Sequence, residues 1–123
     1  MEYLGPYCEM LGSTHTNSLI RQMCDYIDSH YAEKLNLNTL SEKFYISREY
    51  ASRIFKKEID TTFINYLTDV RLKHACHLLV HTDLSVATIA DRTGFRESGY
   101  LIRVFRKMYG LTPKEYRENK GNK

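Results

Sequence analysis

Two arginines, Arg53 and Arg103, are the residues of this chain best suited to chemistry. Each stands on a polar stripe of a segment whose other residues repeat with a helical period. A guanidinium donates two parallel hydrogen bonds, and the major-groove edge of guanine presents two matching acceptors, O6 and N7. We therefore take both arginines as candidates for contacts to DNA bases. The alternative for each is a contact to phosphate alone, or an ion pair with a nearby acid.

The neighbours of these arginines on the same stripes complete the set of candidates. Glu49 can accept a hydrogen bond from N4 of cytosine, or it can pair with Arg53 one helical turn later. Ile102 is unexpected on a polar stripe, and contact with a thymine methyl group would explain it. Gly99 limits contacts to backbone and shape, whereas a serine hydroxyl can bond to base or phosphate. The base-contact candidates are Glu49, Ser52, Arg53, Ser98, Gly99, Ile102 and Arg103.

The net charge of +3 is too small to identify a nucleic-acid partner, but the positive charges are unevenly distributed. They gather around the two stripes, where the phosphates of a duplex would be met. Backbone N–H groups at the helix starts near Asn36 and Ser85 are further expected phosphate contacts. The side chains predicted to contact phosphate are Arg48, Lys56, Lys57, Arg96, Arg106 and Lys107.

Two short helices joined by a tight turn are expected to position the second stripe. Ser85 is expected to cap the first helix, which stops at Thr93-Gly94, and Gly110 ends the second. This is a helix-turn-helix pattern, although an ordinary helical hairpin with a charged face would look similar. The residues expected to face inward are Val86, Ile89 and Ala90 on the first helix, and Tyr100, Leu101, Val104, Phe105 and Met108 on the second.

The same pattern occurs earlier in the chain. Thr39 pairs with Thr88 at an offset of 88 − 39 = 49 residues, and Arg53 pairs with Arg103 at an offset of 103 − 53 = 50. The one-residue difference falls in the turn, where an insertion is tolerated best. Two copies of one unit are therefore predicted.

In the first copy, Asn36 and Ser47 are the expected caps of a helix over residues 37–44 and of the helix that follows it. Leu37, Leu40 and Phe44 should face inward with Tyr50, Ile54 and Phe55. Asp60 stands where the second copy has Gly110, and it should take a left-handed conformation.

At this level of detail the chain resembles a known family. The segment GFRESGYLIRVFRKMYGLTPKEYR looks like the C-terminal signature of AraC/XylS-family bacterial transcription regulators, and ISREYASRIFKKEI looks like the matching first motif. The resemblance covers about residues 19–117, and it implies Arg at both recognition positions. Departures from the family pattern are Ser41 in place of Ala, Leu101 in place of Phe, and Gly99 and Ile102 in place of polar residues.

The remaining helices should frame these motifs. Residues 18–32 show an amphipathic helix, and residues 63–80 show the longest helical pattern, roughly 27 Å at about 1.5 Å per residue. A rod of that length could hold two recognition helices about one DNA turn apart. Tyr66 and Tyr116 should pack as matched corner residues of the two copies. On the long helix, a solvated polar stripe is preferred over a metal site for His74, His77 and His81, because no Cys or carboxylate completes a ligand set.

Composition excludes several other classes of protein. A share of 42% hydrophobic and 27% charged residues is ordinary for a folded domain. Three cysteines without CxxC spacing favour neither a disulfide framework nor a zinc site, and Cys24 fits a core position better than a nucleophile. No apolar run approaches the roughly 20 residues of a membrane span, and no signal peptide is seen, so a cytoplasmic location is expected.

The prediction is an all-α chain with two helix-turn-helix subdomains and about seven helices, without cofactor, metal or enzymatic activity. The expected parts are a linker or tail at 1–17, a first subdomain at 18–61, a connecting helix at 62–81, a second subdomain at 82–118 and a tail at 119–123. The expected function is sequence-specific binding of double-stranded DNA in transcription regulation, with RNA polymerase as a further partner. The alternative is a protein-interaction module of the same fold that recruits polymerase or a partner regulator. The irregular start and the segment TFINYLTDVRL favour a C-terminal piece of a larger regulator with an upstream sensory or receiver domain. The alternative is that the chain is a complete protein.

Overall fold

Seven α-helices and no strand make up residues 15–121, the part of the chain that the computed structural model describes. The predicted all-α class is therefore confirmed. The chain divides into two compact units, with the boundary between Thr68 and Asp69. Of the predicted linker at 1–17, residues 15–17 belong to the first described helix, and the others lie outside the described residues.

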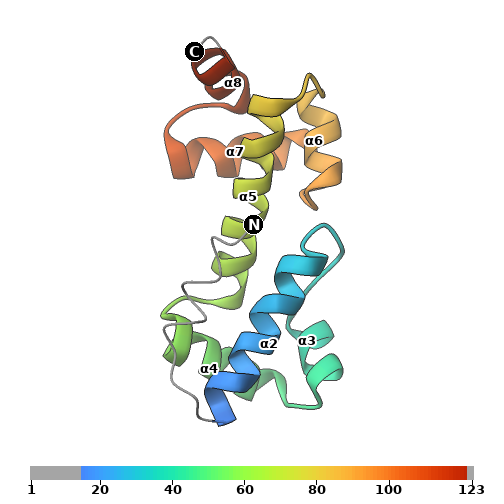
Figure 1. Ribbon diagram of the computed structural model, residues 1–123, viewed down its shortest axis with the longest axis vertical. Coiled ribbons are helices and arrows are strands. Elements are labelled where there is room, and N and C mark those ends of the chain that lie inside the picture. Colours follow the sequence, from blue (N-terminus) through green and yellow to red (C-terminus); the bar gives the residue numbers. More distant parts are fainter. Residues whose placement is uncertain (1–14, 122–123) are drawn as a thin grey trace. The chain divides into compact units, whose positions relative to one another are not determined.

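The first unit contains α2 (His15–His30), α3 (Leu37–Phe44), α4 (Arg48–Ile59) and the beginning of α5 (Phe63–His81), as Figure 1 shows. Both α2 and α3 pack against α4. The predicted amphipathic character of α2 is confirmed, because Ile20, Met23, Cys24 and Ile27 are fully buried. Burial of such side chains is the main favourable contribution to the stability of the unit. The largest buried side chains of the first three helices are Ile20, Met23, Ile27, Leu40, Phe55 and Ile59.

The second unit contains the rest of α5, followed by α6 (Val86–Arg92), α7 (Ser98–Tyr109) and α8 (Pro113–Gly121). One hydrophobic cluster joins all four helices, and Tyr116 of α8 packs against its edge. The buried members of the cluster are Leu72, Ala75, Leu79, Ile89, Ala90, Phe95, Leu101 and Phe105. This cluster fixes which side of α7 faces inward, and so which side faces out.

The predicted helix starts are confirmed. Asn36 Oδ1 accepts a hydrogen bond from the Thr39 N–H at 2.9 Å, and Ser47 Oγ accepts one from the Tyr50 N–H at 3.0 Å. Ser85 Oγ does the same for α6. Each cap satisfies one of the N–H groups that the first turn of a helix leaves without a partner.

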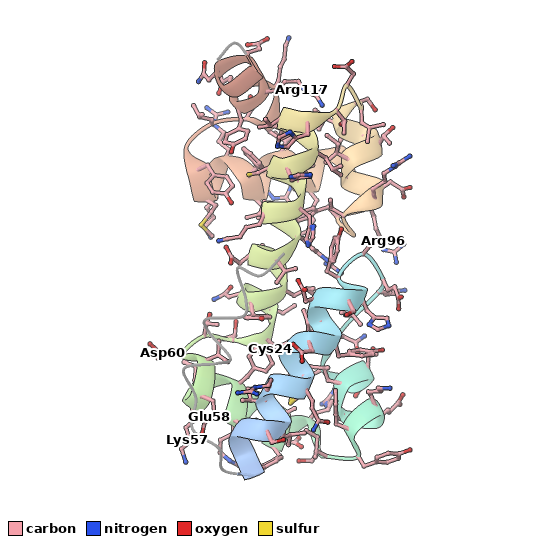
Figure 2. All side chains as sticks on the ribbon, viewed as in Figure 1. Cys24, Lys57, Glu58, Asp60, Arg96 and Arg117 are labelled. Atoms are coloured by element: carbon pink, nitrogen blue, oxygen red, sulfur yellow. The ribbon has the colours of Figure 1, made fainter. Side chains whose placement is uncertain are left out.

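The predicted helix ends are also confirmed. Asp60 and Gly110 both adopt the left-handed conformation, with φ of 66° and 78°, and each donates its backbone N–H to the carbonyl four residues earlier. Asp tolerates this conformation better than most residues, and Gly adopts it without steric cost. Figure 2 shows Asp60 beside Lys57 and Glu58, where α4 ends.

The two copies also match at the start of their third helices. The Thr62 hydroxyl accepts the N–H of Asn65 at 3.1 Å, and the Thr112 hydroxyl accepts the N–H of Glu115 at 3.1 Å. One turn later, Tyr66 packs edge-on to Phe55 with ring centroids 5.4 Å apart, and the rings of Tyr116 and Phe105 lie 5.3 Å apart. The prediction of matched corner tyrosines is therefore confirmed.

The predicted buried face of α7 needs two corrections. Leu101 and Phe105 are fully buried, but Tyr100 is 40% exposed and Met108 is 55% exposed. Tyr100 lies at the edge of the apolar face, one position before Leu101, so part of its ring reaches solvent. Met108 lies in the last turn of α7, beyond Phe105, the final α7 residue of the buried cluster.

Smaller differences concern residues at the ends of the predicted faces. Leu37, Phe44 and Tyr50 in the first unit, and Val104 in the second, are half-buried rather than buried. The Ser41 hydroxyl donates to the Asn38 carbonyl oxygen at 2.9 Å, which is the local bond expected where the family pattern has Ala.

Candidate nucleic-acid interface

The first stripe runs along α4 on the side opposite its buried residues. Ala51, Ile54 and Phe55 point into the core, so the residues between them face solvent. A shallow depression of about 490 Å³ lies on this side and is open to solvent. It is lined by Leu37, Arg48, Glu49, Ser52 and Arg53. The structure thus brings together the four α4 candidates closest to the start of the helix.

Arg53 lies against an aromatic ring and forms no ion pair with Glu49. Its guanidinium carbon is 5.6 Å from the centroid of the Tyr50 ring, one helical turn earlier. Neither residue forms an ion pair with any acid or base within the described residues. Glu49 and Arg53 therefore do not pair in this structure, and no carboxylate of the described residues occupies the N–H groups of the Arg53 guanidinium.

The second stripe runs along α7. Leu101 and Phe105 fix the inward side, and the predicted contact residues on the other side are exposed, except that Ser98 is half-buried. Ile102 is 37% exposed, so its apolar side chain reaches the solvent-facing side of α7. At Gly99 an added Cβ would have no atom within 4 Å, so packing within the protein does not require glycine there.

Arg103 repeats the arrangement of Arg53. Its guanidinium carbon lies 5.2 Å from the centroid of the Tyr100 ring. The Tyr100 ring in turn packs against the buried Phe95, with centroids 5.6 Å apart and planes inclined by 60°. Arg103 also forms no ion pair with the described part of the chain. The helical periodicity identified both arginines, but their contacts with Tyr50 and Tyr100 were not predicted. The i, i+3 spacing of each pair was a signal for these contacts.

The turn between α6 and α7 holds two residues in the left-handed region, Gly94 with φ of 91° and Arg96 with φ of 75°. Figure 2 labels Arg96 at this turn. Arg71 of α5 is half-buried near Arg96 and Tyr100. Burial lowers the pKa of Arg71, and the charge of Arg96 lowers this pKa further. Arg71 still carries its charge near neutral pH, since a guanidinium pKa starts far above 7.

The predicted phosphate contacts all point into solvent. Arg48, Lys56, Lys57, Arg96, Arg106 and Lys107 are exposed. The N–H groups of Thr39 and Thr88 are taken by the caps of α3 and α6, so a phosphate at either helix start would meet the remaining N–H groups.

Other chemistry finds little support in the described residues. The rings of His77 and His81 lie with centroids 4.4 Å apart and planes inclined by 42°, but no group of three His, Cys, Asp or Glu side chains within residues 15–121 could hold a metal ion. Burial raises the pKa of the Cys76 thiol, which favours the protonated and unreactive form. Within the same range, none of the helices combines the length and the apolar composition that crossing a membrane requires.

Comparison with known proteins agrees with this geometry. A family model described as a helix-turn-helix domain matches residues 40–119. The chain belongs to the AraC-type helix-turn-helix family. It is similar to the C-terminal domain of AraT, a response regulator from Geobacillus stearothermophilus, with a TM-score of 0.82 and 32% identity over 86% of this chain and 88% of that one.

Two other comparisons extend the picture. The chain is 39% identical to YijO, an uncharacterised helix-turn-helix transcriptional regulator of Escherichia coli K12, over 89% of its own length. It spans only 40% of the length of YijO. The DNA-binding domain of AdpA, solved in complex with a target DNA, gives a TM-score of 0.76 at 28% identity over 87% of this chain and 93% of that one.

Proposed function

We propose that this chain binds double-stranded DNA in a sequence-specific manner and regulates transcription, with α4 and α7 as its two recognition helices. The observation that carries the proposal is the repeated pair of exposed arginines. Arg53 and Arg103 occupy the same register, and each lies over a tyrosine ring without a carboxylate partner. Membership of the AraC-type family and the likeness to a domain solved with DNA support it.

The two helices divide the work between base and phosphate contacts. We infer that Arg53 and Arg103 each bind the O6 and N7 of a guanine, since this is the commonest specific contact in the major groove. Glu49 and Ser52 add contacts in the first half-site, and Ser98, Gly99 and Ile102 add contacts in the second. Arg48, Lys56, Lys57, Arg96, Arg106 and Lys107 bind phosphates and set the register on the duplex.

A single chain with two such motifs should read two boxes on one face of the duplex. We infer that α4 and α7 enter adjacent major grooves, so the two boxes should lie about 10 base pairs apart. One monomer would then contact two half-sites, which single-motif repressors do as two-fold dimers.

Selection of bound duplexes from a random DNA pool, at near-physiological salt, tests the proposal. Two enriched boxes should appear, and Arg53→Ala and Arg103→Ala should each relax the preference in one box only. Arg103→Lys keeps the charge but lacks the bidentate fork, so it should lose most of the preference too. Lys114→Ala serves as a control for loss of one charge, because Lys114 is exposed on α8, which packs against the buried side of α7. Salt-sensitive binding without an enriched motif would contradict base reading.

Phosphate contacts are tested separately by salt dependence. Lys57→Ala or Lys107→Ala should weaken binding to all sequences alike and lower the salt slope by about one unit. An unchanged slope would show that the residue faces away from DNA.

A protein-interaction module of the same fold is the second candidate. The observation that favours it is the exposure of Ile102 and Met108 on α7, since exposed apolar side chains also suit a protein partner. In that case RNA polymerase or a partner regulator would be recruited without DNA being read. We also propose a cytoplasmic location, and an upstream sensory or receiver domain because the similar AraT domain is the C-terminal domain of a response regulator. Absence of binding to any duplex would favour the protein-interaction module.

A further inference from the structure

We propose that Tyr50 and Tyr100 are positioning residues that hold the guanidinium groups of Arg53 and Arg103 ready for base contact. The inference rests on the proposed function, because it concerns how the two arginines read DNA. It assigns a role in specificity to two side chains that need not touch a base themselves.

The geometry is the same in both units. The guanidinium carbons lie 5.6 Å and 5.2 Å from the tyrosine ring centroids, within the roughly 6 Å over which a cation and an aromatic face attract each other. Tyrosine and arginine are separated by three positions in each case, so they lie on neighbouring turns of one helix face. The repetition at equivalent positions argues against a chance contact of two mobile side chains.

A ring holds an arginine in a different way from a carboxylate. An aromatic face attracts the guanidinium through its charge and accepts no paired hydrogen bond, so it does not occupy the five N–H donors in the way a carboxylate does. A carboxylate would occupy two of those donors, and DNA would then have to displace it. Because Arg53 and Arg103 have no such partner among the described residues, their donors remain available while their rotamers are restricted. Less side-chain freedom is then lost when the base contact forms.

In the second unit, the Tyr100 ring is itself held in place by packing against the hydrophobic core. Phe95 is buried, and its ring packs against Tyr100 at 5.6 Å. Tyr100 therefore connects the hydrophobic core to Arg103. In the first unit, the backbone N–H of Tyr50 is bonded to the cap residue Ser47, which fixes the start of the helix beneath Arg53.

A double-mutant cycle tests the role of Tyr100. The measured quantity is the ratio of dissociation constants for a duplex with the selected second box and one in which the base pair assigned to Arg103 is replaced. Tyr100→Leu should lower this ratio about two- to fivefold, the effect expected from an exposed cation–aromatic contact. Tyr100→Phe keeps the ring and should retain the ratio. In the Arg103→Ala background, Tyr100→Leu should have no further effect on it.

A measurement without DNA keeps the test independent of binding. The side-chain proton resonances of Arg103 should show the ring-current shift of a stacked group in the parent chain and in Tyr100→Phe, and should lose it in Tyr100→Leu. Two results would overturn the positioning role. One is an equal ratio of dissociation constants for Tyr100→Leu and Tyr100→Phe. The other is a Tyr100→Leu substitution that lowers this ratio as much in the Arg103→Ala background as in the parent chain. If Arg103→Ala leaves the ratio unchanged, base reading by Arg103 has failed, and the positioning role fails with it. Tyr50 and Arg53 provide the same cycle for the first box.

Discussion

The two helix-turn-helix copies share buried aromatic residues and differ at several exposed positions of their outer stripes. Phe55 and Phe105 occupy equivalent positions, and both are fully buried against a corner tyrosine. On the outer stripes, Glu49 corresponds to Gly99, and Ser52 corresponds to Ile102. Packing therefore constrains the shared fold, whereas the outer positions can differ, as two different DNA preferences under the proposed function would require.

The turns between the helices show a second difference. The first turn uses one left-handed residue, Tyr45, whose side chain is 93% exposed. The second uses Gly94 and adds Arg96, also left-handed, which is the extra residue responsible for the change of offset from 49 to 50. An insertion in a turn is accommodated by a special backbone conformation, and the helices on either side are preserved.

The third helices differ most in how they are held, and equivalent substitutions should show it. Leu67 is buried in the first unit, and its counterpart Arg117 donates through Nε to the Leu79 carbonyl at 2.9 Å and through Nη2 to the Thr82 carbonyl at 3.0 Å. Figure 2 shows Arg117 near the end of α5. Leu67→Ala should reduce the free energy of unfolding by about 2–5 kcal/mol. Arg117→Ala should reduce it by about 1.5–3 kcal/mol through two lost charge-assisted hydrogen bonds.

Chemical denaturation followed by circular dichroism measures both effects. Leu67→Met is the matched control in the first unit and should cost less than about 1.5 kcal/mol. Arg117→Lys should fail to restore stability, because an ammonium group lacks the planar fork that bonds both carbonyls. Full stability of the lysine variant would show that charge alone matters at this position.

The two turns should respond differently to alanine. Gly94→Ala should cost about 1–2 kcal/mol, because a side chain is added at a φ of 91°. Tyr45→Ala should cost much less, since the parent residue already carries a Cβ at a φ of 58° and its ring is almost wholly exposed. Thermal unfolding of both variants checks the difference. A similar loss at Tyr45 would mean that its ring stabilises the turn.

The starts of α4 and α7 provide a smaller contrast. Ser47 makes a side-chain cap bond at the start of α4, whereas Glu97 makes none at the start of α7. Ser47→Ala should therefore cost about 1 kcal/mol. Glu97→Ala should cost less than half as much, because only a favourable carboxylate near the positive end of the helix is lost.

Glu97→Ser tests the same contrast in the opposite direction. It supplies the missing acceptor and should stabilise the second unit. A destabilised serine variant, measured by urea denaturation, would show that the backbone around Glu97 cannot place a cap.

Local chemistry explains why so much of the fold could be predicted from the sequence. The caps at Asn36, Ser47 and Ser85 and the left-handed ends at Asp60 and Gly110 depend on bonds within a few residues. The exposures of Tyr100 and Met108 could not be predicted, because they depend on where the neighbouring helices stop covering α7.

Side-chain contacts that depend on tertiary packing or on rotamers also could not be predicted from the helical periodicity. Arg117 bonds to carbonyls 38 and 35 residues away, which no local spacing indicates. The cation–aromatic contacts of Arg53 and Arg103 with Tyr50 and Tyr100 need particular rotamers in addition to the helical spacing. The contact residues themselves were named because helical periodicity separates inward from outward positions.

Exchange of the residues at 52 and 102 should alter the difference between the two boxes. Ile102→Ser should reduce discrimination of thymine from cytosine in the second box about fourfold, the effect of one apolar methyl contact of about 0.8 kcal/mol. Ser52→Ile is the reciprocal variant and should introduce a preference for thymine in the first box. Binding to duplexes that differ by one base measures both. Unchanged discrimination after Ile102→Ser would contradict the methyl contact.

Gly99 should give the smallest effect on stability and an effect on binding confined to one box. An added Cβ has open space around it, so Gly99→Ala should stabilise α7 by about 0.5 kcal/mol through its better helix propensity. Because no packing in the protein explains the glycine, we expect it to allow close approach of DNA. The alanine variant should then bind the second box more weakly and the first box unchanged. Equal binding of both boxes by the stabilised Gly99→Ala variant would show that this turn of α7 lies away from the duplex.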